Sequence, residues 1–404
     1  MLAYAANIVV DGRPVVPVSV AVAPEMLTWA LERSGQDSQV LERTFPRLPE
    51  WRRGEALPTI KQLETFARKT RTPVGYLLLD EPPDEPVPIP DYRTLGDGGV
   101  ARPSPNLLDA VALCQLRQDW YRDHVRLTGG EPVAFVGSVT VDDDPVQVGR
   151  TIGMATAFDV EDRTDFRSWT EALSAFSNRV EELGVLVMRS GVVGSNTHRR
   201  LDPDEFRGFA LSDPIAPVIF INGRDTVAAQ IFTLAHELAH LWLGGSALDS
   251  PELGLSQPSA AQHAPHGHIE IWCNQVAAEI LVPSESLQAQ FDPTALLVDE
   301  VDRLVRLYRV SSLVVLRSLF DGEHVSWTAF REAWLTELDR MAARTGADGG
   351  DYYRTQPVRI SKRFAQAVIV STLEGHTLYR DAFRMLGFRK QSTFDEWSRQ
   401  LGLA

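Results

Sequence analysis

The N-terminal part of the chain alternates short helical patterns with turn signals. Between residues 24 and 79, apolar residues recur at the three- and four-residue spacing of one helix face, and Gly35 and Pro46 interrupt the pattern. Pro58 is well placed to open a further helix, because proline is favoured in a first turn. Short helices joined by tight turns are typical of a helix-turn-helix unit, which we predict for residues 1–80.

A proline-rich stretch follows this module. Five prolines fall between Asp80 and Arg93, and proline disrupts both helix interiors and central strands. Residues 81–104 are therefore predicted to be a stiff linker or a wrapping segment that ends the first domain.

The centre of the chain mixes helical and strand patterns. Helices are expected at 105–125, 167–183, 227–243 and 269–281, and short strands at 185–188, 206–211 and 217–221. This mixture predicts a mostly helical α+β domain with a small sheet over residues 105–345. If the strand at 217–221 is a sheet edge, an extended peptide could pair with it. Beyond a glycine-rich break, residues 346–404 are expected to form a small, mostly helical C-terminal domain.

Composition narrows the class of protein. The 404 residues, 44% of them hydrophobic, are enough for two to four domains at about 100–200 residues per domain. Two distant cysteines, Cys114 and Cys273, exclude a disulfide-rich scaffold and a cysteine-only zinc site. We expect no secretory signal and no membrane span, and hence a cytoplasmic protein. A net charge of −14 argues against a nucleic-acid surface over the whole chain.

The strongest chemical signal is the pattern H-E-x-x-H at residues 236–240. On a helix, His236 and His240 lie one turn apart on the same face, where two neutral imidazoles can bind one metal ion. Glu237 lies about 100° round the helix, where it could act as general base on the attacking water without binding the metal. Such a pattern arises by chance in a chain of this length on the order of once in a hundred. Its apolar helical setting further favours a metal site, because polar side chains on a buried helix need a partner.

The third metal ligand is expected on the helix at 269–281. The metzincin pattern needs glycine and histidine where this chain has Leu243 and Ser246, so a carboxylate is the alternative. Glu270 and Glu279 are nine residues apart and point to opposite faces. Glu270 shares its face with small and apolar residues and is favoured; Glu279 is the alternative ligand, or else a solvated residue or an ion-pair partner.

Other residues near the site have weaker assignments. Asn274 is one turn beyond Glu270 and could orient an imidazole through a hydrogen bond. His263, His266 and His268 lie in the loop between the two helices, where one of them could stabilise an oxyanion or bind adventitious metal. Three histidines this close together more commonly belong to a flexible polar loop with no chemical role. The ligand set accepts Zn²⁺, with Mn²⁺ or Fe²⁺ as alternatives.

These residues resemble the ImmA/IrrE family of bacterial metallopeptidases. The resemblance rests on FTLAHELAHLWLG at 232–244, on IFIN at 219–222, and on Glu270 to Asn274 followed by AAEILVP at 277–283. It spans roughly 165–320 and implies a gluzincin-like fold. It also implies that His236, His240 and Glu270 bind the metal and that Glu237 is catalytic. Cys273 stands where the family usually has alanine.

The resemblance extends to the N-terminal module, since residues 24–79 look like a helix-turn-helix of the XRE type. The segment that would be the recognition helix, 46–54, is short and carries two prolines. Arg47, Arg52 and Arg53 could contact phosphates. A module that docks a partner protein is the alternative to one that binds DNA.

The resemblance also implies a biological role. Members of the family typically cleave a cognate repressor or antitoxin and so activate stress, mobile-element, DNA-damage or toxin–antitoxin responses. Our first hypothesis is therefore a zinc-type metallopeptidase that makes limited cuts in such a regulatory protein. The alternative is a DNA- or partner-binding regulator whose metal site is structural or vestigial. The sequence leaves the oligomeric state open.

Overall fold

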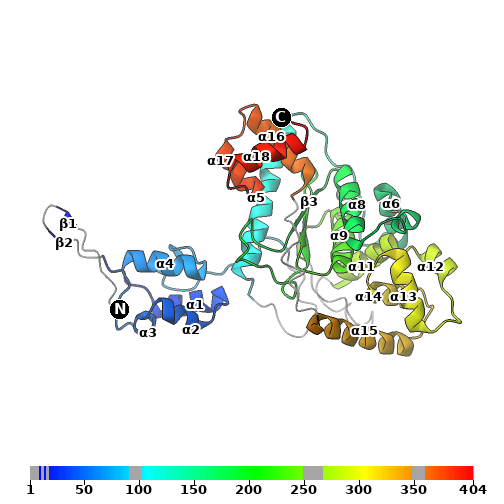
Figure 1. Cartoon of the computed structure of the whole chain (residues 1–404), viewed down its shortest axis with the longest axis horizontal. Coiled ribbons are helices and arrows are strands. Elements are labelled where there is room, and N and C mark those ends of the chain that lie inside the picture. The colour runs from blue at the N-terminus through cyan, green and yellow to red at the C-terminus, as the bar shows by residue number, and fades with distance from the viewer. Residues whose placement is uncertain are drawn as a thin grey trace. The chain divides into compact units, whose positions relative to one another are not determined.

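The structure, a computed structural model, describes residues 9–10, 13–14, 18–90, 102–248, 267–347 and 360–403 (Figure 1). The chain divides into two compact units. The first comprises Met1–Val87 and Ala101–Leu108, and the second comprises Pro88–Val100 and Asp109–Ala404. None of the described helices combines the length and the apolar character that a bilayer crossing requires.

The first unit is a bundle of short helices with its own core. Its elements are β1 (Val9–Val10), β2 (Arg13–Pro14), α1 (Pro24–Ser34), α2 (Ser38–Thr44), α3 (Leu48–Arg52), α4 (Ile60–Thr70) and the 3₁₀ turn η1 (Tyr76–Leu78). Gly35 ends α1 in the left-handed conformation, with φ of 61°. Thr59 and Gln62 form a capping box that starts α4. Trp29, Trp51 and Phe66 are buried between the helices.

The described part of the proline-rich segment belongs to the first unit up to Val87 and to the second from Pro88, and each part contacts its own unit. Glu85 forms an ion pair with Arg33 in the first unit. Further on, Ile89 is buried, and the carbonyl of Pro90 accepts a hydrogen bond from Leu248 in the second unit. An extended segment of this kind suits proline, because proline has no backbone N–H to donate to a helix or to a β-sheet.

The second unit contains a four-stranded mixed sheet in the order β3-β5-β4-β6. The strands are β3 (Leu186–Ser190), β4 (Gly208–Leu211), β5 (Val218–Asn222) and β6 (Ala247–Leu248). β3 and β5 are parallel, whereas β4 is antiparallel to β5 and to β6. The strand at 217–221 does not meet the condition for peptide pairing, because it is a central strand and not a sheet edge. β5 is hydrogen-bonded on both sides, so its backbone is not available to an extended peptide.

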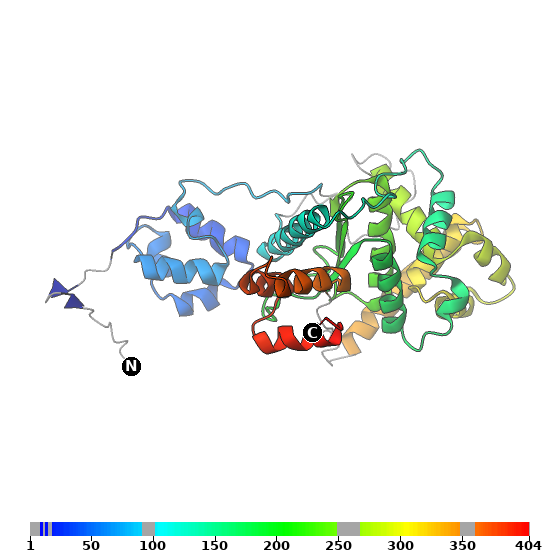
Figure 2. The same ribbon diagram turned by 90° about the horizontal axis from the view of Figure 1, so that it is seen from above.

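Helices cover both faces of this sheet, which confirms a mostly helical α+β architecture. The helices are α5 (Pro105–Leu127), α6 (Pro145–Thr156), α7 (Val160–Arg163), α8 (Trp169–Glu182), α9 (Val227–Leu243), α11 (Gly267–Leu281), α12 (Ser284–Gln290), α13 (Leu297–Tyr308), α14 (Ser312–Asp321), α15 (Trp327–Ala347), α16 (Lys362–Leu373), α17 (Tyr379–Leu386) and α18 (Gln391–Gln400). α8 and α9 contact one face of the sheet. α5 lies against the other, where Gln118 donates to the carbonyls of Leu211 and Ala216. α16 lies beside α5 (Figure 2), with Phe364 against Trp120.

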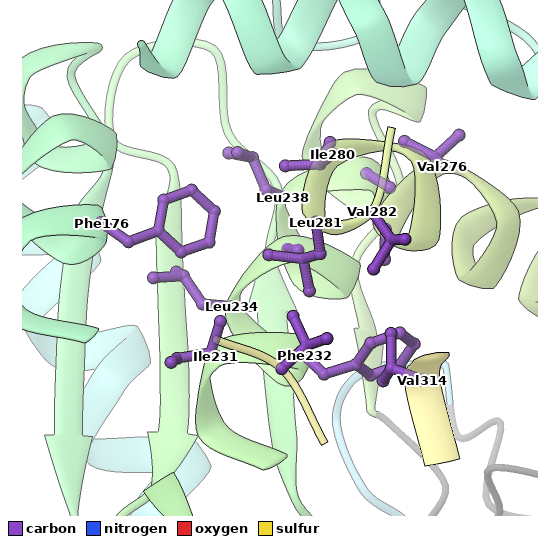
Figure 3. Close-up of a cluster of buried hydrophobic side chains, with 14 of the residues drawn as sticks. Phe176, Ile231, Phe232, Leu234, Leu238, Val276, Ile280, Leu281, Val282 and Val314 are labelled. Atoms are coloured by element: carbon purple, nitrogen blue, oxygen red, sulfur yellow. The ribbon is translucent and has the colours of Figure 1, made fainter. Parts of the chain in front are cut away.

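A continuous apolar core joins α9 to its neighbours. Ile231, Leu234 and Leu238 of α9 meet Phe176 of α8 and Ile280 of α11 (Figure 3). Each such side chain contributes about 1.5–3 kcal/mol when it is fully buried. The core therefore fixes α9 and α11 against each other, and these are the two helices that carry the motif residues.

Candidate metal centre

Helix α9 is a buried helix with well-formed ends. Thr226 caps its N-terminus by accepting a hydrogen bond from Ala229, and Gly244 ends it with φ of 76°. His236 and His240 are each 1% exposed, and their Nε2 atoms are 3.1 Å apart. Two imidazoles buried in an apolar helix need a polar partner, because unpaired polar groups are costly in a core.

Helix α11 supplies that partner. Glu270 is 3% exposed, and its carboxylate oxygens lie 3.2 Å from Nε2 of His236 and 3.2 Å from Nε2 of His240. One ligand atom from each residue falls within 4.8 Å of the others, a spacing that could hold a metal ion. Two imidazole nitrogens and a carboxylate oxygen match the ligands that divalent transition metals take in open catalytic sites.

The surroundings shift the ionisation of two residues of the site. Burial lowers the pKa of His240, which favours the neutral imidazole whose Nε2 lone pair can coordinate. Burial alone would raise the pKa of Glu270, but the charge and hydrogen bonds of the two adjacent histidines outweigh it and lower that pKa. An ionised Glu270 therefore needs positive charge beside it, which protonated histidines supply and which a divalent cation would supply with both histidines neutral.

Two further residues of α11 contact the outer nitrogens of the histidines. Asn274 Oδ1 lies 2.9 Å from Nδ1 of His236, so the imidazole can donate to the amide oxygen. Cys273 Sγ lies 3.6 Å from Nδ1 of His240. A hydrogen bond at Nδ1 fixes the ring orientation and leaves Nε2 without a proton. Asn274 thus stands where an orienting group was expected.

Glu237 is fully buried beside strand β4. A Cβ atom added to Gly208 would lie 3.1 Å from Oε1 of Glu237, 2.4 Å from Cγ2 of Thr233 and 2.9 Å from the carbonyl oxygen of Phe220. The glycine therefore allows β4 to approach α9 closely at the position of the carboxylate. Sequence reasoning missed this role of Gly208, although a glycine inside an expected strand is a known sign of a close approach.

The structure does not bring Glu279 to the histidines. Its carboxylate instead lies 3.2 Å from Nε of Arg150 and accepts a hydrogen bond from the backbone N–H of Ser284. Gly149 makes this contact possible, because an added Cβ would lie 2.6 Å from Cβ of Glu279. Glu279 thus acts as an ion-pair partner between α6 and α11.

The remaining candidates lie elsewhere. His263 and His266 fall outside the described residues, and His268 is exposed on the first turn of α11. In the first unit, Arg47 pairs with Glu50 and Arg53 pairs with Glu55, both at the surface. Nε of Arg52 lies 3.4 Å from Oγ1 of Thr28. α3 has five residues, which is short for a helix that reads a DNA groove.

Comparison with known proteins bears on two parts of the chain. Residues 360–400 match a domain of unknown function, DUF8813. No curated protein and no solved structure matches the chain. Residues 180–320 match the peptidase family model described as IrrE N-terminal-like domain, and this part contains Glu237 and the three clustered residues His236, His240 and Glu270. The match supports the ImmA/IrrE resemblance and a metallopeptidase-like function for the central domain, and the buried cluster is consistent with a divalent metal ion.

Proposed function

We propose that the protein is a metal-dependent endopeptidase that makes limited cuts in a regulatory protein, a repressor or an antitoxin. The observation that carries the proposal is the convergence of His236, His240 and Glu270, with Glu237 on the next position of the same helix. A purely structural metal site has no use for that second acidic residue. The match of the surrounding domain to a peptidase family supports the same chemistry.

The three clustered residues would hold the ion, with Zn²⁺ first and Mn²⁺ or Fe²⁺ as alternatives. When bound, a divalent ion supplies Lewis-acid chemistry, polarising a peptide carbonyl and making water acidic enough to react near neutral pH. Glu237 would accept the proton of the attacking water at its carboxylate and pass it to the leaving amine. Asn274 would keep the proton of His236 on Nδ1, so that Nε2 stays available as a ligand.

Elemental analysis tests the metal site before any substrate is known. Purified wild type is expected to carry about one ion per chain, and the variants His236→Ala and Glu270→Ala should lose it. Glu279→Ala is the matched control on α11, because its carboxylate pairs with Arg150, and it should retain the ion. A wild type that is metal-free and cannot be reloaded would refute the proposed function.

A second experiment tests the catalytic role of Glu237. New protein N-termini are compared between cells that express wild type and cells that express Glu237→Gln. The variant should retain its metal, because Glu237 is not among the clustered ligands, and the cleavage products of a regulatory protein should disappear. Equal cleavage by the two forms would refute the mechanism.

The second candidate function is a regulator that binds DNA or a partner through the first unit. The order of α1 to α4, with short turns between them, is the observation that favours it. Arg47 and Arg53 form ion pairs with Glu50 and Glu55, which weakens the case for phosphate contacts by these two arginines. Tight operator binding with a steep salt dependence, in a protein that lacks metal, would favour this candidate.

A further inference from the structure

A buried positive charge lies far from the metal ligands in sequence, between α5 and α17. Arg117 of α5 is only 4% exposed. Its Nε donates to the carbonyl of Met385 at 2.9 Å, and its Nη1 lies 3.8 Å from Sδ of Met188, a weak acceptor. Among the residues that the structure describes, no carboxylate pairs with it. Burying an unpaired charge costs several kcal/mol, so this arrangement requires an explanation.

A second buried arginine, Arg163, has hydrogen-bond acceptors for all three of its guanidinium nitrogens. The guanidinium of Arg163 donates to the carbonyls of Phe158, Ile280, Leu281 and Tyr308, using all three nitrogens. Those carbonyls account for its burial without any ligand. Arg117 differs, because Nη2 makes no hydrogen bond within the described part of the chain and Nη1 faces only a sulfur.

A small cavity lies beside Arg117, between α5 and the sheet. Cys114, Met188 and Ser190 are among the residues that line it, and its free space of about 10 Å³ is room for roughly one water-sized species. The other polar groups of the lining cannot neutralise Arg117, because Arg189 is itself a cation and the remaining ones carry no negative charge. Burial raises the pKa of Cys114 to about 12, so the thiol stays neutral, and the Ser190 hydroxyl donates to the carbonyl of Val192.

We propose that this cavity binds one small monovalent inorganic anion of halide size, held by the Nη groups of Arg117. The charge favours an anion over water, because an anion offsets the desolvation cost of the guanidinium. The size of the cavity excludes phosphate, carboxylates and nucleotides. Arg117 itself contacts α17 at the carbonyl of Met385 and β3 at Sδ of Met188, and the anion would neutralise the charge of that contact.

Chloride-35 NMR of the full-length protein tests the site directly. Exchange with a protein site broadens the chloride line, and we expect broadening by wild type that bromide reverses by competition. Arg117→Met, which keeps an unbranched apolar side chain, should lose the broadening. Arg384→Met removes an exposed arginine from α17 and is the control that should retain it. Equal broadening by wild type and Arg117→Met overturns the proposal.

A second measurement needs no variant, in case Arg117→Met fails to fold. Crystals of wild type are grown or soaked in bromide, whose anomalous signal distinguishes it from water. A bromide peak within hydrogen-bonding distance of the Arg117 guanidinium is expected. A water alone at that position in saturating bromide overturns the proposal. Neither experiment depends on peptidase activity, so the result is independent of the proposed function.

Discussion

Replacing Asn274 with alanine should weaken metal binding without touching a ligand. The side chain lies on α11, one turn beyond Glu270, and its Oδ1 is 2.9 Å from Nδ1 of His236. Without that acceptor, the imidazole is free to carry its proton on either nitrogen and to rotate. Only the form with the proton on Nδ1 presents a lone pair at Nε2 toward the carboxylate of Glu270.

The expected loss is about 10–100-fold in metal affinity, the usual effect of removing a hydrogen bond to a metal-binding histidine. That ratio corresponds to ~1.4–2.7 kcal/mol. Competition with a chromophoric chelator measures it, and Gln275→Ala, at the exposed neighbouring position, is the control that should bind like wild type. Asn274→Asp should bind at least as tightly as wild type, because a carboxylate makes the histidine a stronger donor to the metal. Affinity of Asn274→Ala within twofold of wild type would refute this role for the hydrogen bond.

Three further predictions follow from single contacts. Gly208→Ala should keep the metal but lose most of the cleavage. Adding Thr233→Ser should restore part of the cleavage, because Cγ2 of Thr233 lies nearest to the added methyl group. Unchanged cleavage by Gly208→Ala would show that the close approach of β4 to α9 is irrelevant. Arg163→Met should lower the free energy of unfolding by about 3–5 kcal/mol in urea titrations, since it leaves four buried carbonyls without their donor; a loss below about 1 kcal/mol would contradict this. Burial alone would raise the pKa of Asp213, but two backbone N–H groups and Arg122 outweigh it and lower that pKa. Asp213 therefore adds stability above its unfolded pKa of about 3.9, and the advantage of wild type over Asp213→Asn should shrink as acid titrates the folded carboxylate; a gap independent of pH would be inconsistent with it.

The residues that local geometry controls could be predicted from the sequence. The spacing of His236 and His240 fixes their relation on any helix, and opposite helix faces separate Glu270 from Glu279 wherever the helix lies. The same local rules located the helices to within a few residues, as for the helix expected at 269–281 and found at Gly267–Leu281. Helical periodicity carried this information because both helices have long apolar faces.

Features that depend on partners distant in the sequence could not be predicted. The apolar run at 217–221 suits either an edge strand or a central strand, and only its pairing with β3 and β4 shows that it is central. Helix α6 was not expected, because PVQVGRTIGMAT contains two glycines and several β-branched residues that disfavour helix. Yet Gly149 is what allows α6 to pack against α11 at Glu279. The residue that concealed the helix is thus required by its packing.

The burial of the three clustered residues bears on what removal of an ion would do to the fold. His236 and His240 are each 1% exposed and Glu270 is 3% exposed, and the apolar core packs α9 against α11 around them. One ligand atom from each residue therefore lies within 4.8 Å of the others without an ion. A site formed in this way needs no ordering of the two helices when it binds its ion, so a chelator should abolish activity while it leaves the central domain folded.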